Sequence, residues 1–476
     1  MVVFVAAAMG GVVLSAALAT GPPILDGRWS LAARLLAWAL LWVVGVGAAL
    51  RLPPRLALVA IVGAGLALRL AALAGGPSTS DDLYRYAWDA RVQAEGINPY
   101  LHPPASGELA ALRDPWLWPD EVGCAELDRP PGCTRINRPG VPTIYPPGAQ
   151  AWFVAVRAVT GGGGGHTTWQ GAGLATEAGV LALLPLALLR WGRDVRWSAL
   201  YALSPSPVLE IVHNGHVDGL AIVLVMGALV VAAPPAREGA DRLAGWRPVL
   251  AGALVGTAVM VKLYPVVLLV ALVGLRGGRL RPMLVRAVAG AGTVAVVFAL
   301  PHVLAVGWRV LGYLPGYLAE EDYAERGRFL VAGALGVPDS VAGVFSVLAV
   351  AATAAWVVLR RPPAPVGATA VLGALLVATS PVQPWYAVAL LAVATVAVQP
   401  VWAAVAAAGY PYYFAVILDH PHAALIGRLA YSTALVAVVV AVLHRPGRSS
   451  YALVGARTEF RPTASPSAVR SDRSLP

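Results

Sequence analysis

Hydrophobic and polar positions alternate in long blocks along this chain of 476 residues. Apolar runs of roughly 18 or more residues recur, and each is long enough to cross the ~30 Å hydrocarbon core of a bilayer. The pattern predicts an all-α, polytopic helical bundle with about 12–14 transmembrane helices. The longer predicted spans are 3–20, 31–50, 56–75, 168–190, 197–212, 216–233, 282–304, 339–359, 365–380, 384–399, 400–418 and 422–443.

Three apolar segments are shorter than a regular span. Residues 147–160 would form only about 21 Å of helix, so we expect partial insertion. Residues 248–261 and 263–276 are flanked by arginines and predict a broken helix with Lys262 at its bend. Irregular backbone at membrane depth is tolerated where it lines a cavity.

Two polar loops interrupt the apolar pattern, at 77–147 and 305–338. The first is too long to be a simple connector, and its pattern predicts an amphipathic helix over 82–96 and a short helix over 108–116. Trp116 and Trp118 suit the headgroup layer, where amphipathic rings are enriched. We therefore expect this loop to lie on the membrane surface.

Composition and charge agree with a membrane protein. Only 13% of the residues are charged, whereas a soluble protein has about 25%. The net charge of +10 is unevenly placed, because loop 77–147 holds ten acidic residues against six arginines while arginines fill the short loops and the tail. This positive-inside asymmetry predicts cytoplasmic termini and an extracytoplasmic first loop, and it requires no nucleic-acid partner.

The ends of the chain add two predictions. The N-terminus lacks a basic region before its apolar run, so we interpret it as the first span of a single polytopic domain, 1–443. Residues 444–476 are rich in Ser, Pro and Arg, which predicts a disordered basic cytoplasmic tail. Thirty-four arginines against one lysine, with abundant Ala, Gly and Pro, are typical of a high-GC bacterium such as an actinobacterium.

Cys124 and Cys133 are the only cysteines, and both lie in the first loop. A close pair on an oxidising exterior predicts a disulfide. A two-cysteine metal site is the alternative, but no histidine pair lies nearby.

Ionisable and aromatic residues gather at one set of predicted helix ends. By the predicted topology these ends all face the extracytoplasmic side, and this convergence predicts an active site there. The residues are Asp81, Asp82, Glu210, His213, His216, Asp218, His302, Gln383, Trp385, Tyr386, Asp419, His420 and His422.

The acidic stretch Ser80–Pro104 is the strongest candidate for chemistry. Asp82, Arg85 and Asp89 share one face of the predicted helix. One carboxylate of the Asp81/Asp82 pair is a candidate general base for an acceptor hydroxyl. The alternative is a solvated helix face beside an N-cap aspartate.

Two further motifs leave alternatives open. Lys262 is either a snorkelling residue at a helix end or a cation that meets an anionic group such as a lipid phosphate. The histidines and aspartate of HNGHVD (213–218) offer metal ligands, but hydrogen bonding to a sugar or phosphate is the favoured interpretation, and no metal or other cofactor is predicted.

The motifs SDDLYRYAWDARVQAEGINPY, INRPGVPTIYPPGAQ, HNGHVDGLAIVL, LAGALVGTAVMVKLYPVVLL and SPVQPWYAVALL occur in this order. Together they resemble the polyprenyl-phosphate-dependent glycosyltransferases of the C superfamily, above all the mannosyltransferase-like family 87. The first loop is also similar to that of the mannosyltransferase of glycosylphosphatidylinositol anchor synthesis. Leu83 stands where that enzyme has the second aspartate of its Asp-x-Asp motif, which weakens the case for a divalent metal.

The resemblance implies an enzyme that transfers a monosaccharide from a polyprenyl-phosphate-linked donor to a lipid or glycan acceptor on the extracytoplasmic side, with inversion. The carried-over base is Asp81, with Asp82 as the neighbouring choice. Lys262, Arg69 or Arg85 would stabilise the leaving phosphate, and Tyr84, Trp88, Trp385 and Tyr386 would offer stacking faces to the sugar. The predicted substrate-binding set is Tyr84, Arg85, Asp89, Tyr145, His213, His216, Asp218, Lys262, Tyr264, Gln383, Trp385 and Tyr386.

Two other function classes fit part of the pattern. A lipid or sugar transporter would explain the broken helix and the intramembrane charges, but the long loop with paired aspartates favours the enzyme. A scaffold of the cell envelope would tolerate replacement of Asp81 and Asp82.

Overall fold

The computed structural model describes residues 1–234, 245–274, 280–321 and 327–444, and its described part contains helices and no strand. The all-helical prediction is confirmed. The helices are α1 (Val2–Ala19), α2 (Ile24–Ala49), α3 (Pro54–Ala71), α4 (Asp82–Ala94), α5 (Glu121–Glu126), α6 (Pro147–Thr160), α7 (His166–Arg190), α8 (Ala199–Ala202), α9 (Pro205–Pro207), α10 (Asp218–Ala232), α11 (Arg247–Val261), α12 (Leu280–Val306), α13 (Leu314–Glu320), α14 (Leu330–Ala334), α15 (Asp339–Arg360), α16 (Ala364–Ala378), α17 (Tyr386–Ala397), α18 (Ala403–Ile417) and α19 (Ala423–Leu443).

Length and composition mark the chain as a multi-pass membrane protein. Among the described residues, eight helical stretches are long and apolar enough to cross a membrane, beginning at Val2, Ile24, Pro54, His166, Pro282, Asp339, Pro400 and Ala423. Five shorter apolar helices, among them α10 and α11, lie in the same bundle. The predicted tail lies outside the described residues, apart from His444.

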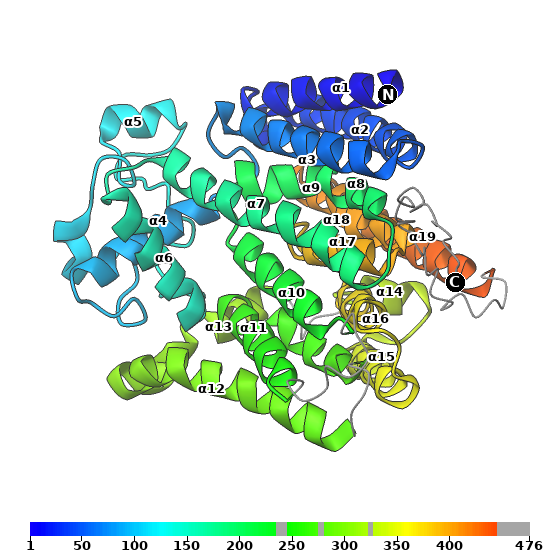
Figure 1. Cartoon of the computed structure of the whole chain (residues 1–476). Coiled ribbons are helices and arrows are strands. Elements are labelled where there is room, and N and C mark those ends of the chain that lie inside the picture. Colours follow the sequence, from blue (N-terminus) through cyan, green and yellow to red (C-terminus); the bar gives the residue numbers. More distant parts are fainter. Residues whose placement is uncertain (235–244, 275–279, 322–326, 445–476) are drawn as a thin grey trace, which may run out of the picture.

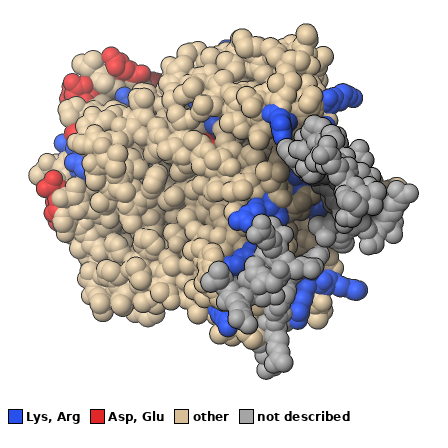
Figure 2. All heavy atoms as spheres, in the orientation of Figure 1, with Lys and Arg blue, Asp and Glu red and all other residues tan. Residues whose placement is uncertain are grey.

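The bundle has two chemically different ends (Figure 1). At one end, which we call the loop end, the segments around α4, α5 and α6 form a cap on the helices. At the opposite end, the arginine end, α1 begins and α19 ends. Figure 2 shows acidic side chains on the loop end, Lys and Arg mostly on the arginine end, and an uncharged belt between them.

Most predicted spans match observed helices within a few residues, but two stretches differ. The second helix begins at Ile24, seven residues before the predicted span, because Pro22 and Pro23 end the preceding turn. The predicted span 197–212 is broken into a 3₁₀ turn (Val195–Ser198), α8, α9 and a π-helix (Val208–His213). Pro205 and Pro207 interrupt the regular hydrogen bonding there.

The loop helix and the broken helix follow the prediction. An α-helix covers Asp82–Ala94, and the short helix predicted at 108–116 is a 3₁₀ helix at Gly107–Leu112. The α11 helix ends at Val261, Lys262 is extended at φ −145° and ψ 139°, and a 3₁₀ helix follows at Tyr264–Gly274. Lys262 thus lies at the bend.

A buried ion pair fixes the helix that leads into the first loop. The Arg69 guanidinium of α3 donates to the Glu177 carboxylate of α7 at 2.6 and 2.8 Å, and both side chains are fully buried. Tyr201 donates to the other Glu177 oxygen at 2.6 Å. Since these groups are paired with each other, we assign Arg69 a structural role, and it does not line the cavity at the loop end.

Candidate active site

A cavity of about 760 Å³ opens at the loop end. The start of α4 and the segment before it form one side, and the ends of α11, α17 and α18 form another. Its lining includes Ile24, Asp26, Ser78, Thr79, Ser80, Asp81, Asp82, Tyr84, Arg85, Arg129, Arg135, Asn137, Arg138, Tyr145, Lys262, Tyr313, Tyr317, Glu321, Gln383, Trp385, Tyr386, Tyr413 and Ile417. Nine of the predicted catalytic and substrate-binding residues are in this set.

The two adjacent aspartates occupy different positions in the cavity. Asp81 is the N-cap residue of α4, its side chain is 47% exposed, and among the described residues it forms one ion pair, with Arg129 at 3.4 Å. Burial raises the pKa of the Asp81 carboxyl, and the charge of Arg129 opposes that rise. Its exposure places Asp81 at the mouth of the cavity.

Asp82 is more enclosed and better oriented. Its side chain is 16% exposed, and its Oδ1 accepts a hydrogen bond of 2.8 Å from the Asn137 amide. Its Oδ2 lies 3.8 Å from His216 Nε2, beyond hydrogen-bond distance. One oxygen is therefore anchored, while the other accepts no hydrogen bond within the described part of the chain.

Lys262 supplies the positive charge of the cavity floor. Its ammonium lies 3.2 Å from the buried Asp218 carboxylate and 5.3 and 5.2 Å from the ring centres of Tyr145 and Tyr386. Neither Asp218 oxygen makes a hydrogen bond of regular geometry within the described chain, where the Lys262 ammonium is the ion-pair partner of Oδ2. A cation held between two aromatic faces keeps donor capacity for a ligand.

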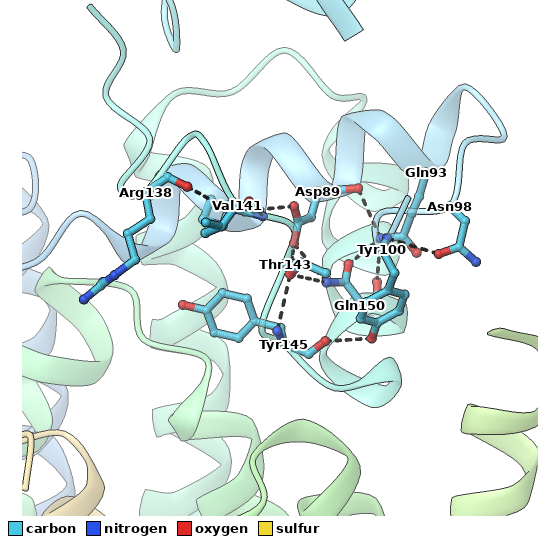
Figure 3. A network of polar contacts seen from close by, with 10 residues as sticks. Asp89, Gln93, Asn98, Tyr100, Arg138, Val141, Thr143, Tyr145 and Gln150 are labelled. Atoms are coloured by element: carbon cyan, nitrogen blue, oxygen red, sulfur yellow. Dashed lines mark hydrogen bonds and ion pairs between the residues drawn. The ribbon is translucent and has the colours of Figure 1, made fainter. Parts of the chain in front are cut away.

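Asp89 does not line the cavity, although it shares a helix with Asp82. Its carboxylate accepts hydrogen bonds from Arg85 at 3.1 Å, Thr143 at 2.5 Å and Gln150 at 2.9 Å (Figure 3). Arg85 also donates to the carbonyl of Val141 at 3.0 Å. These contacts fasten α4 to the segment 138–150, and they occupy the groups predicted to bind substrate.

Four other predicted residues lie behind the cavity wall. His213, His216 and Asp218 are at most 1% exposed and belong to no part of the cavity lining, and the hydroxyl of Tyr264 is buried as well. His216 stacks on Trp385 with ring centres 4.2 Å apart. The 213–218 motif therefore lies next to cavity residues such as Trp385 and Lys262 and does not line the cavity itself.

The predicted convergence of polar helix ends is only partly present. His302 contacts Asn98 and Tyr100 and lies outside the cavity lining. Asp419, His420 and His422 are exposed and also outside it. Trp88, predicted as a sugar-stacking ring, is buried against Trp118.

Several cavity residues were not predicted. Asn137 anchors Asp82, and its place in the INRPG motif is a signal that could have identified it. Arg129, Arg135 and Arg138 face the cavity from the same loop. The start of α2 also contributes through Pro23–Asp26, which no local pattern indicates because the contact is long-range.

The cysteines of the first loop are joined, with an S–S distance of 2.19 Å. The bridge closes the segment after α5, next to Leu127, Asp128 and Arg129 of the cavity lining. Among the described residues, no group of three or more His, Cys, Asp or Glu side chains is arranged to hold a metal ion.

Of the comparisons with known proteins, the one with protein-family models gives a match. Neither the curated proteins nor the solved structures include a significant match. The model of glycosyltransferase family 87 matches residues 143–381, which is half of the chain and includes Tyr145, Lys262 and the 213–218 motif. The chain therefore belongs to glycosyltransferase family 87.

Proposed function

We propose that this membrane glycosyltransferase moves a mannosyl residue from a polyprenyl-phosphate-linked donor to a hydroxyl of a lipid or glycan acceptor. Transfer takes place on the extracytoplasmic face of the cell membrane, at the loop end, with inversion at the anomeric carbon. Family membership supports glycosyl transfer in a membrane. The sugar, the carrier and the side of the membrane are part of the proposal.

One observation carries the mechanism. A carboxylate with a free oxygen, Asp82, and a cation, Lys262, line the same cavity at the end of the apolar bundle. A donor with an isoprenoid tail keeps that tail in lipid while its phosphate and sugar reach such a cavity. An acceptor hydroxyl at headgroup level enters from the polar side, where Arg129 and Arg135 lie.

The reaction is a single displacement. The Asp82 carboxylate takes the proton of the acceptor hydroxyl as that oxygen forms a bond to the anomeric carbon. The bond between this carbon and the phosphate oxygen breaks, and the phosphate leaves with the electron pair. Lys262 stabilises the negative charge that grows on the leaving oxygen.

Asp82 is a better base than Asp81 in this geometry. The Asn137 amide fixes Asp82, which costs no reorganisation when the acceptor arrives. Asp81 is half exposed and faces Arg129, so we assign it to the acceptor side of the cavity. Trp385, Tyr386 and Tyr84 offer ring faces, and Gln383 offers an amide, for the sugar hydroxyls.

The test is glycosyl transfer by the purified full-length protein in detergent, with polyprenyl-phosphate-mannose and a pool of membrane lipids. We expect Asp82→Asn to lower kcat by about 10²–10⁴-fold with the fold intact, which is the range of general-base catalysis. Asp81→Asn should lower the rate less. The exposed Glu121→Gln on α5 is the matched control and should keep the full rate.

Each outcome assigns a role. Loss in Asp81→Asn alone would make Asp81 the base. Full activity in both variants would show that the proposed site is wrong. A wild type that is inert with several donor sugars, but moves lipid across vesicles, would support the transporter.

A further inference from the structure

Three consecutive residues before the aspartate pair each contact a residue of the 213–216 motif. We propose that His213, Asn214 and His216 are positioning residues, which hold Ser78, Thr79 and Ser80 as a clamp and thereby set the place of Asp81 and Asp82. The inference rests on the proposed function for its catalytic readout. It assigns to this motif a role other than contact with the sugar or phosphate.

The contacts pair the two segments in order. Ser78 Oγ lies 2.9 Å from His213 Nε2, and Ser80 Oγ lies 3.0 Å from His216 Nε2. Between them, the Asn214 amide donates to Thr79 Oγ1 at 2.5 Å, and its oxygen accepts from the Thr79 backbone N–H at 3.3 Å. The middle pair therefore binds both the side chain and the main chain of residue 79.

The second nitrogen of each histidine is also occupied. His213 Nδ1 lies 3.0 Å from the carbonyl of Ala72, and His216 Nδ1 lies 2.8 Å from the carbonyl of Glu210. A carbonyl only accepts, so each Nδ1 carries the proton and each Nε2 accepts from a serine hydroxyl. With both nitrogens engaged and the rings at most 1% exposed, neither histidine has an atom left for substrate.

The local backbone explains why three side chains can point the same way. Residues 208–213 form a π-helix, whose wider turn changes the angle between successive side chains. Gly215 then adopts φ +69°, which the other residue types rarely do, and this turn skips one residue between Asn214 and His216. Leu83 of α4 lies against Gly215, where a Cβ would be 3.2 Å from a leucine methyl.

Other parts of the chain hold the same segment. The Ile24 N–H donates to the Ser78 carbonyl at 3.0 Å, and Tyr413 donates to the Thr79 carbonyl. Ser80 Oγ in turn accepts from the Asp82 N–H at 3.3 Å. Ser80 thus connects the clamp to the first turn of α4. The backbone of residues 80–82 connects it to the Asp82 carboxylate.

The middle pair gives the sharpest test, since Asn214 lies outside the cavity lining. Thr79→Val removes the hydroxyl and Thr79→Ser, the matched control, keeps it. We expect Thr79→Val and Asn214→Leu each to lower kcat by about 10–100-fold with both KM values unchanged within twofold, because misplacement of a reacting group by about 1 Å costs on this order. Thr79→Ser should retain near-wild-type kcat.

The double variant measures whether the two residues act together. A clamp predicts that Thr79→Val/Asn214→Leu is no slower than the slower single variant, because the second change removes a contact that is already lost. Additive losses, or a rise in KM with unchanged kcat, would overturn the proposal in favour of separate roles or direct substrate binding.

A second readout does not depend on activity. Hydrogen exchange of the full-length protein should be faster at residues 78–84 in Asn214→Leu and in Thr79→Val, while residues 89–94 keep their protection. Unchanged exchange at 78–84 would overturn the clamp even if the enzyme were active. If the wild type transfers no sugar, the proposed function fails, and the exchange result still decides the clamp.

Discussion

Asp82 and Asp89 lie two turns apart on α4, yet their surroundings differ completely. Asp89 is 2% exposed and accepts from three side chains, which belong to α4, the 138–146 segment and α6. Asp82 lines a cavity, with one oxygen anchored by Asn137 and the other without a hydrogen bond among the described residues. Asp89 therefore connects α4 to neighbouring segments, whereas Asp82 on the same helix is a candidate base.

The two regions also differ in unpaired polar atoms. Around Asp89, the Gln93 amide donates to the Gln150 side chain, and the Tyr100 hydroxyl donates to the carbonyl of Tyr145 (Figure 3). Next to the cavity, the Tyr264 hydroxyl and Trp385 Nε1 have no hydrogen-bond partner among the described residues. Buried polar groups are normally satisfied, so these two atoms beside the cavity are candidates for contacts with a ligand.

The largest expected effect tests the Asp89 network. Asp89→Asn leaves the Arg85 guanidinium buried without its carboxylate, and breaking a buried pair in this way costs about 3–5 kcal/mol. We expect a large fall in melting temperature in detergent. Asp82→Asn, which faces the cavity, is the control and should melt near the wild type. Equal melting of Asp89→Asn and wild type would show that the network does not support the fold.

The second prediction concerns Lys262 and separates charge from packing. Lys262→Met removes the cation for the leaving phosphate and should lower kcat by about 10²–10³-fold, the cost of losing one electrostatic donor. It also leaves Asp218 unpaired, so Lys262→Met/Asp218→Asn is needed to remove both charges together. That double variant should recover stability without recovering activity. Recovery of activity would mean that Lys262 only neutralises Asp218.

The third prediction compares one hydroxyl from each region. Thr143→Val deletes a donor to Asp89 and should lower the free energy of unfolding by about 1–3 kcal/mol. Tyr264→Phe deletes a hydroxyl with no described partner and should leave stability unchanged or slightly higher. Thermal melting of both variants checks the contrast. A destabilised Tyr264→Phe would place that hydroxyl in an internal network like that of Asp89.

The sequence predicts the bundle well because long apolar runs and arginine-rich turns are local signals. Helices α6 and α15 illustrate this, since their observed starts match the predicted ones. The site is less predictable. Periodicity places Asp82 and Asp89 on one face but does not reveal which segment packs against each. The start of α2, Pro23–Asp26, lines the cavity through a long-range contact that no local pattern encodes.

The many donors and acceptors of the HNGHVD motif favour sugar or phosphate binding when the sequence is considered alone. The structure pairs three of these residues with Ser78, Thr79 and Ser80, more than 130 positions earlier in the chain. Such pairing depends on the π-helix and on the conformation of Gly215. Residue types thus identify which positions are polar, while tertiary contacts decide what those positions do.

The smallest expected effect concerns Asp81 and depends on pH. Burial raises its pKa in the folded protein above the unfolded value, so its contribution favours the fold at acidic pH and is lost as pH rises through the folded pKa. Asp81→Asn should therefore raise the melting temperature at pH 7 by about 1–2 °C, a small gain because the side chain is half exposed. This gain in melting temperature should shrink as the pH falls toward 4, because the Asp81 carboxyl then becomes protonated in both the folded and the unfolded protein. Melting curves of the variant and the wild type at several pH values check this, and a lower melting temperature of the variant at pH 7, with a difference that shrinks on acidification, would show that the charge of Arg129 dominates the environment of Asp81.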